Sequence, residues 1–167
     1  MKHSNLLPEN NKMPIVRIAP VCNGKIYVVP RHVEREKTLM DLPIEETIEQ
    51  PSPPSNRMAS KIREKYNRHI QTSVSPRFCV KYTSPYQGNI IYLYILPLQA
   101  EDEIHFQNGE FIEADEIGSH GEIYSPNLQK EGNLLGMAAE LWNDYQTELC
   151  QNKKTAQPTN PVVCVSR

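Results

Sequence analysis

Apolar residues fall in short runs along the chain, separated by polar connections that are rich in proline. The first strong run covers residues 15–30, where IVRIAPV and KIYVVP flank Asn23-Gly24. Asn-Gly supplies the positive φ angles that a tight hairpin turn requires. The pattern therefore predicts a β-hairpin over residues 15–30.

A loop and then a helix are predicted next. Residues 43–54 mix acids with four prolines, which indicates a loop with at most an isolated strand near residues 47–48. Ser55 or Asn56 can cap the following helix. From Met58 to Ile70 an apolar residue recurs at every fourth position, so the helix is predicted over 56–70 with one face packed on apolar residues.

The second half of the chain predicts further strands and a long final helix. Residues 78–83 and 89–98 read as paired strands, and the second is apolar almost throughout, which is typical of a central strand covered on both faces. IHFQNGEFIEA predicts another hairpin around Asn108-Gly109, followed by a short turn or helix at 115–117. The last helix is predicted over 133–150, with a broad apolar stripe facing the core.

These elements predict an α/β (α+β) fold in which a mixed β-sheet lies between helices. A chain of 167 residues fits one domain. We expect a polar N-terminal extension at 1–13, a single domain at 14–150 and a C-terminal tail at 151–167, in which residues 162–165 could pair as a short edge strand.

Composition and charge narrow the classes of function. With 18 basic and 20 acidic residues, no global field favours nucleic acid or an anionic membrane. The longest apolar run, residues 90–96, is far shorter than the ~20 residues that span a bilayer. The polar N-terminal segment does not resemble a signal peptide, so the prediction is a cytoplasmic protein. The spacing of the cysteines and histidines matches no zinc or iron–sulfur motif.

Three segments resemble the Nudix hydrolase family. APVCNGKIYVVPR resembles the family's first hairpin, and Asp41-Leu42-Pro43 resembles the Leu-Pro that precedes its paired glycines. Residues 111–117, FIEADEI, resemble its late segment of aromatic and acidic residues. The resemblance covers residues 14–150 and implies a Nudix-like mixed sheet between helices.

The family signature itself is degenerate. It is Gly, five residues, Glu, seven residues, then Arg-Glu, an aliphatic residue, any residue, Glu-Glu, any residue, Gly and an aliphatic residue. Counted from the Leu-Pro landmark, Pro51 replaces the first glutamate and Ala59-Ser60 replace Arg-Glu, which leaves Glu64 in the Glu-Glu pair. With four extra loop residues, Arg63-Glu64 match Arg-Glu, but Asn67-Arg68 stand in place of Glu-Glu.

Candidate site residues follow from the resemblance. Glu64, common to both registers, is the candidate catalytic residue, and Glu64 with Glu49 are candidate ligands of Mg²⁺ or Mn²⁺, required only if the protein is active. Arg31, Arg63 and Arg68 are the candidate ligand-binding cations. A hard divalent cation prefers about six oxygen ligands, and these two carboxylates fall short of that number.

Three readings of function stay open at this point. The missing carboxylates favour a Nudix-like protein that is catalytically impaired or inactive and binds a nucleotide-like ligand or a protein partner in the old cleft. The alternative is a metal-dependent hydrolase of nucleoside diphosphate-linked compounds that uses noncanonical acids. A stand-alone α/β domain only convergently similar to the family is the third. The sequence leaves oligomer formation open, and the resemblance requires helix 56–70 to pack on strand 89–98.

Overall fold

The computed structural model describes residues 12–34, 37–49 and 54–156, with side chains for 12–32, 37–49 and 54–144. Most of the predicted N-terminal extension and the predicted strand at 162–165 lie outside the described residues. Strands β1 (Ile15–Cys22) and β2 (Lys25–Glu34) form the first hairpin. Asn23 and Gly24 have φ angles of 54° and 79°, which confirms the predicted turn.

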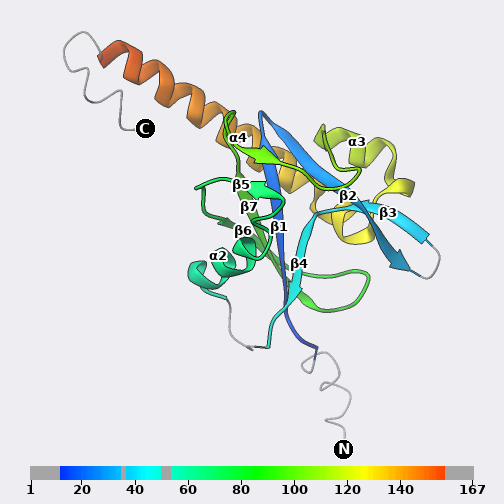
Figure 1. Cartoon of the computed structure of the whole chain (residues 1–167). Helices are drawn as coiled ribbons and strands as arrows, with labels where there is room; N and C mark the ends of the chain where they lie inside the picture. Colours follow the sequence, from blue (N-terminus) through cyan, green and yellow to red (C-terminus); the bar gives the residue numbers. More distant parts are fainter. Residues whose placement is uncertain (1–11, 35–36, 50–53, 157–167) are drawn as a thin grey trace, which may run out of the picture.

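The fold centres on a mixed β-sheet (Figure 1). Within the described residues it has seven strands in the order β3-β2-β1-β7-β6, with β4 paired to β1 and β9 paired to β2. β1 runs parallel to β7, and its Ile15 lies opposite Ile91. The remaining strands of this sheet are β3 (Lys37–Asp41), β4 (Ile44–Thr47), β6 (Arg77–Thr83), β7 (Ile90–Pro97) and β9 (Glu110–Ile112).

Strand β7 is the predicted central strand. It pairs with β1 on one side and with β6 on the other. Residues from Ile91 to Pro97 are all buried, because helices cover both faces of the sheet. The predicted mixed sheet between helices is therefore confirmed.

Helix α2 (Asn56–Glu64) covers one face. Ser55 caps it, since the Ser55 Oγ accepts a hydrogen bond from the Met58 N–H at 3.1 Å. Ala59 and Ile62 share a buried apolar cluster with residues of β7, so the helix packs on the strand as the resemblance required. The helix ends earlier than predicted, because Ile70 is extended in β5 (Ile70–Gln71) and pairs with β8 (Glu103–Ile104).

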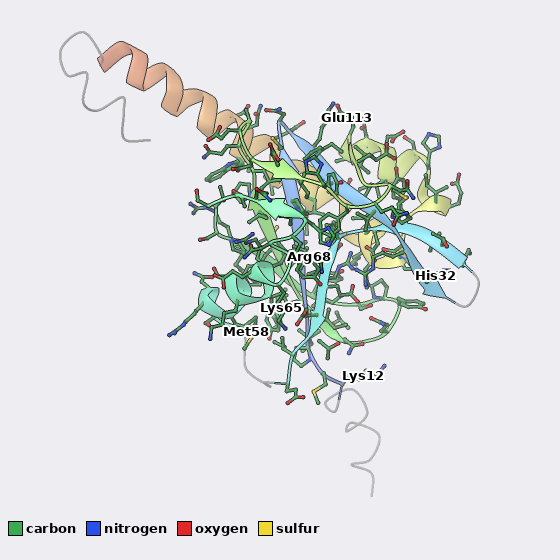
Figure 2. The ribbon with its side chains drawn as sticks, in the orientation of Figure 1. Lys12, His32, Met58, Lys65, Arg68 and Glu113 are labelled. Carbon is green, nitrogen blue, oxygen red and sulfur yellow. The ribbon has the colours of Figure 1, made fainter. Side chains whose placement is uncertain are left out.

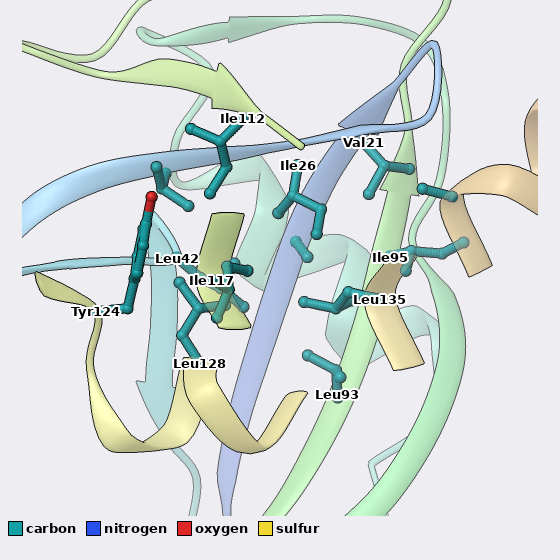
Figure 3. Close-up of a cluster of buried hydrophobic side chains, with 13 residues drawn as sticks. Val21, Ile26, Leu42, Leu93, Ile95, Ile112, Ile117, Tyr124, Leu128 and Leu135 are labelled. Carbon is teal, nitrogen blue, oxygen red and sulfur yellow. The ribbon is translucent and has the colours of Figure 1, made fainter. Parts of the chain in front are cut away.

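Helices α3 (Ala114–Ser119) and α4 (Pro126–Ala156), with the short 3-10 helix η2 (Gly121–Ile123) between them, cover the opposite face. Their buried side chains close a second apolar cluster against β1, β2 and β7 (Figure 3). α4 begins seven residues before the predicted start, since Ser125 Oγ accepts from the Leu128 N–H and Pro126 suits the first helical position. It also continues past Cys150 into the predicted tail, while the domain boundaries stay a prediction.

Two predictions of local structure are wrong. Residues 43–54, predicted as a loop with at most an isolated strand near 47–48, contain β4, which pairs with β1; β3 was not predicted and pairs with β2. The turn at Asn108 is present, but β8 and β9 do not pair with each other, because β8 pairs with β5 and β9 with β2.

None of the helices in the described part of the chain combines the length and apolarity needed to cross a membrane.

Candidate functional site

An irregularity in β6 decides which side chains reach the α2 face of the sheet. Phe78 lies opposite Tyr94 and Lys81 opposite Tyr92, but the pairing shifts by one residue between Phe78 and Val80. Side chains alternate along a regular strand, so residues three apart would face opposite sides. The extra residue of a bulge removes that alternation. Phe78 and Lys81 therefore share one face.

Those side chains line a cavity of about 350 Å³ beside the N-terminus of α2. Phe78 is 53% exposed, and its ring meets that of Tyr94 edge to face, with ring centroids 5.5 Å apart. The Tyr94 hydroxyl donates to the Pro54 carbonyl at 3.4 Å. The cavity thus has an aromatic floor and one ammonium at its side, and its lining residues are Pro54, Asn56, Phe78, Lys81, Tyr92 and Tyr94.

A more polar groove of about 630 Å³ shares Asn56 and Phe78 with this cavity. It adds Arg57, exposed in the first turn of α2, and Arg77, whose guanidinium carbon lies 4.9 Å from the centroid of the Trp142 ring. The first turn of α2 carries no acidic residue, so nothing on it offsets the positive end of the helix dipole. The two hollows together offer an aromatic surface next to a region that favours an anion.

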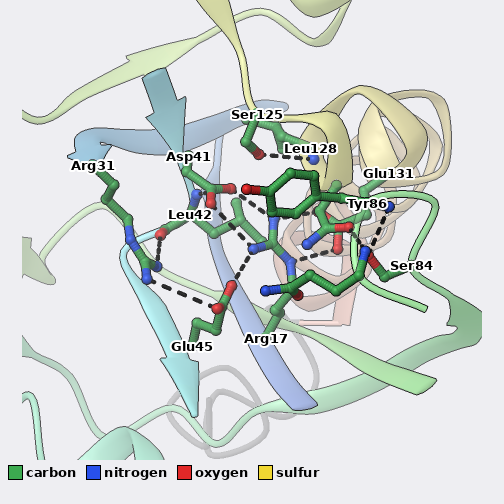
Figure 4. A network of polar contacts seen from close by, with 12 residues as sticks. Arg17, Arg31, Asp41, Leu42, Glu45, Ser84, Tyr86, Ser125, Leu128 and Glu131 are labelled. Carbon is green, nitrogen blue, oxygen red and sulfur yellow. Dashed lines mark hydrogen bonds and ion pairs between the residues drawn. The ribbon is translucent and has the colours of Figure 1, made fainter. Parts of the chain in front are cut away.

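On the opposite face, Arg17 forms a buried ionic network that the sequence reasoning missed (Figure 4). Its Nε and Nη2 donate to Glu131 at 2.7 Å each, and its Nη2 and Nη1 donate to Asp41 at 2.7 and 3.3 Å. Nη1 also donates to Glu45 at 2.6 Å, and the Tyr82 hydroxyl donates to Glu131 at 2.6 Å. The network links β1, β3, β4, β6 and α4. A single charged residue within the apolar run IVRIAPV was the available signal.

Burial and charge shift the acids of this network in opposite directions. Burial raises the pKa of Glu131, and Arg17 offsets that rise only in part. Burial also opposes ionisation of Asp41, but Arg17 outweighs it and holds the pKa of Asp41 below its ordinary value. Burial and the neighbouring Glu131 raise the pKa of Tyr82, which stays a neutral donor. The three carboxylates of the network, Asp41, Glu45 and Glu131, are all bonded to the Arg17 guanidinium. We therefore assign the network to the stability of the fold.

The sequence-predicted site residues come from β2, from the segment after β4, and from α2 and the turn that follows it. Glu64 is exposed at the end of α2, and Glu49 is exposed after β4. The Arg31 Nη1 donates to the Leu42 carbonyl at 3.0 Å. Arg63 is buried, and its Nη1 has no hydrogen-bond partner among the described residues. Arg68 is exposed past the C-terminal end of α2 (Figure 2).

Comparison with known proteins gives matches in structure alone. No protein-family model matches the chain, and no curated protein matches it in sequence. The C-terminal domain of mouse MUTYH, solved in complex with human PCNA, matches with TM-score 0.54 and 11% identity over 82% of this chain and 91% of that domain. A bifunctional NMN adenylyltransferase/ADP ribose pyrophosphatase from Francisella tularensis, complexed with AMP and a Mn ion, matches with TM-score 0.53 and 15% identity over 80% of this chain and 45% of that one.

DR0079 from Deinococcus radiodurans gives TM-score 0.51 and 15% identity over 72% of this chain and 81% of that chain. Several solved Nudix hydrolases are among the structures that match. The fold is Nudix-like. At these identities the likeness concerns the fold alone.

A Nudix-like fold raises the question of a divalent metal. Mg²⁺ and Mn²⁺ take oxygen ligands, and Mg²⁺ demands a nearly complete octahedron. In the described part of the chain, no three His, Cys, Asp or Glu residues come together in a way that could hold a metal ion. Lys65 pairs with Glu46 at 2.9 Å, so a cation already neutralises an acid beside the end of α2. The donors that the described residues bring together do not fit such a metal.

Proposed function

We propose that this chain is a Nudix-like binding protein that holds a nucleotide-like ligand in the cavity beside α2, and that its capacity for metal-dependent hydrolysis is impaired or lost. One observation carries the proposal: the β6 bulge brings an exposed aromatic ring, Phe78, and an ammonium, Lys81, to the same hollow. Aromatic side chains stack on bases, and cations recognise phosphate.

The ligand would place its base on the ring of Phe78 and its phosphate toward Lys81 and Arg57. Stacking of a base on an aromatic side chain contributes about 1–3 kcal/mol. The cavity volume of about 350 Å³ lies within the range of small-molecule sites. The floor of the cavity, Tyr92 and Tyr94, is already buried and held in place by the sheet, so these side chains would lose little conformational freedom when a ligand binds.

The acids support binding over hydrolysis. Glu64 and Glu49, the candidate metal ligands, are both exposed and belong to no cluster of three acids within the described residues. Around Glu64, the solvent-facing positions of α2 and the turn after it carry Lys61, Lys65 and Arg68. These positive side chains would repel Mg²⁺ and weaken its binding near Glu64.

The similar structures illustrate both kinds of binding. The Francisella enzyme was solved with AMP and a Mn ion, and the MUTYH domain was solved in complex with PCNA. For this chain we propose a nucleotide-derived small molecule as the first ligand to test and a protein partner as the second. Binding to nucleic acid or to a membrane is not part of the proposal, and a cytoplasmic location stays a prediction.

Isothermal titration with AMP, adenosine and ADP-ribose, each in EDTA, tests the proposal. We expect AMP to bind without metal and Phe78→Ala to weaken AMP and adenosine at least about fivefold, the loss that ~1 kcal/mol of stacking implies. Lys81→Gln should weaken AMP but leave adenosine unchanged. Two exposed positions outside the cavity give matched controls, Ile123→Ala and Lys130→Gln, which should leave affinity unchanged.

The same titrations decide against the proposal if none of the three compounds binds, or if both Phe78→Ala and Lys81→Gln bind as tightly as the unaltered chain. A parallel incubation of ADP-ribose with Mn²⁺ tests the hydrolase alternative by chromatography of released AMP. Turnover that is lost in Glu64→Gln would establish that alternative, with Glu49 as the next metal ligand to vary. Arg31, Arg63 and Arg68 would then be varied as its ligand-binding cations.

A further inference from the structure

The aromatic cavity and the polar groove beside α2 adjoin and form one hollow. They share Asn56 and Phe78, and their volumes are about 350 and 630 Å³. The cavity alone has the size of a small-molecule site, so the groove adds room for a further group of the ligand. None of the described residues that line either part is acidic, although the whole chain has a net charge of −2. The hollow therefore favours an anionic ligand larger than a nucleoside monophosphate.

Phe78 lies between two positively charged parts of this hollow. Along β6, Lys81 follows Phe78 on the same face of the sheet and lines only the cavity. The groove is lined by the residues just before Phe78, Ser75–Arg77, and by Arg57 of α2. Because an extended chain advances about 3.3 Å per residue, Lys81 and the groove stand on opposite sides of Phe78 along the strand. A base stacked on the Phe78 ring would therefore have a cation on each side.

Arg57 is the cation of the groove that a ligand can use. It is exposed in the first turn of α2, and among the described residues its side chain makes no ion pair or hydrogen bond. The same holds for Lys81 in the cavity. Arg77 differs, because its guanidinium carbon lies over the ring of Trp142, 4.9 Å from the ring centroid. The hollow thus offers two separate cations, Lys81 and Arg57, whose charges no described acid neutralises by direct contact.

We propose that the ligand carries two phosphates on opposite sides of its nucleoside, as a nucleoside 3′,5′-bisphosphate does. This inference rests on the proposed function, because it requires the base of the ligand to stack on Phe78. Lys81 would hold the phosphate that AMP also has, and Arg57 would hold the second phosphate in the groove. Ser60 and Ser75 line the groove as well and supply hydroxyl donors. A guanidinium suits this role, since it can bind a phosphate through two parallel hydrogen bonds.

The position of the second phosphate follows from the position of the two cations. A diphosphate chain on one side of the ribose would bring both of its phosphates to the same side of Phe78. One of the two cations would then lack an anion. Phosphates on both sides of the nucleoside give each cation a partner.

Isothermal titration in EDTA, at one fixed ionic strength, compares adenosine 3′,5′-bisphosphate with AMP and with ADP, which has both phosphates on one chain. We expect the bisphosphate to bind about tenfold more tightly than AMP, a difference of ~1.4 kcal/mol. ADP should bind within about threefold of AMP. Arg57→Gln should bring the bisphosphate within about twofold of AMP. The matched control is Lys61→Gln, an exposed cation one turn later on α2 that lines neither part of the hollow, and it should keep the tenfold difference.

Two phosphates also flank each nucleoside inside a nucleic-acid strand, and a further arm of the titration separates that source from a free nucleotide. Its probe is a trinucleotide of adenosine with a 5′-phosphate. Phe78 is the exposed ring among the aromatic residues that line the hollow, so one base can stack there. We therefore expect the trinucleotide to bind no more tightly than the bisphosphate. Tighter binding by the trinucleotide would contradict a free nucleotide as the ligand.

The outcomes separate failure of this inference from failure of the proposed function. If AMP binds and the bisphosphate binds no more tightly, the second phosphate site is wrong and the AMP site stands. The second site is also wrong if ADP matches the bisphosphate, or if Arg57→Gln keeps the tenfold difference. If neither AMP nor the bisphosphate binds, the proposed function fails and this inference fails with it. Because each variant is titrated with both ligands, a variant that does not fold is recognised by its loss of AMP.

Discussion

Replacing Arg17 with methionine should destabilise the fold more than any other single removal of charge. Arg17 is fully buried and donates five hydrogen bonds to three carboxylates, those of Asp41, Glu45 and Glu131. Removing one partner of a buried ion pair costs about 3–5 kcal/mol, because the remaining charge is left without compensation. Here three acids lose their shared cation, so we expect a loss of at least about 4 kcal/mol, a large share of the ~5–15 kcal/mol typical of a domain.

Urea unfolding followed by far-ultraviolet circular dichroism measures this loss. With a slope of roughly 2 kcal/mol per molar urea, the midpoint should fall by about 2 M. Arg68→Met removes an exposed cation and should shift the free energy of unfolding by no more than about 0.5 kcal/mol. Adding Asp41→Asn and Glu131→Gln to Arg17→Met should recover part of the loss, since fewer buried charges remain unpaired. A midpoint within 0.5 M of the unaltered chain would refute this account of the network.

Three further outcomes can be measured by the same unfolding assay. Because Arg17 lowers the pKa of Asp41, ionised Asp41 stabilises the fold at pH values above its ordinary pKa near 3.8, and this stabilisation is lost as the pH falls through the lower pKa of the folded state. The difference in free energy of unfolding between Asp41→Asn and the unaltered chain should therefore narrow between pH 4 and pH 2. Gly109→Ala should cost about 1–3 kcal/mol, since a Cβ there would lie 2.3 Å from the Tyr27 hydroxyl, whereas Gly118→Ala meets nothing within 4 Å and should not destabilise. Arg63→Met should be neutral or stabilising, because it removes a buried donor, Nη1, that has no hydrogen-bond partner among the described residues; a loss above about 1 kcal/mol would show that Arg63 makes a stabilising contact.

Local patterns in the sequence predicted the parts of the fold that depend on local physics. Asn23-Gly24 fixed a hairpin because only a few residue types accept its backbone angles. The apolar run of β7 identified a strand covered on both faces. Pairing between distant segments was the weak point. β8 and β9 flank a turn yet take partners elsewhere, because the choice of partner depends on which open sheet edges lie nearby.

The candidate sites were less predictable for two separate reasons. The family resemblance directed attention to Glu64, Glu49 and three arginines, while the hollow with aromatic walls lies beside the N-terminus of α2, at the opposite end of that helix from Glu64. That hollow depends on a bulge, and no residue type marks its position in β6. The Arg17 network had a signal in sequence, a lone cation in a buried strand, but its three acids come from segments 24 to 114 residues away.

The bulge in β6 has a consequence for how the chain can change. Because one additional residue sets the facing of Phe78 relative to Lys81, the composition of the cavity depends on strand length as much as on residue identity. Deleting Cys79 would remove the bulge and leave Phe78 and Lys81 two residues apart, so both side chains would still face the same side of the sheet. A related chain could therefore lose the bulge residue and keep the cavity, whereas a chain with the same three-residue spacing on a regular strand would turn one of the two side chains away.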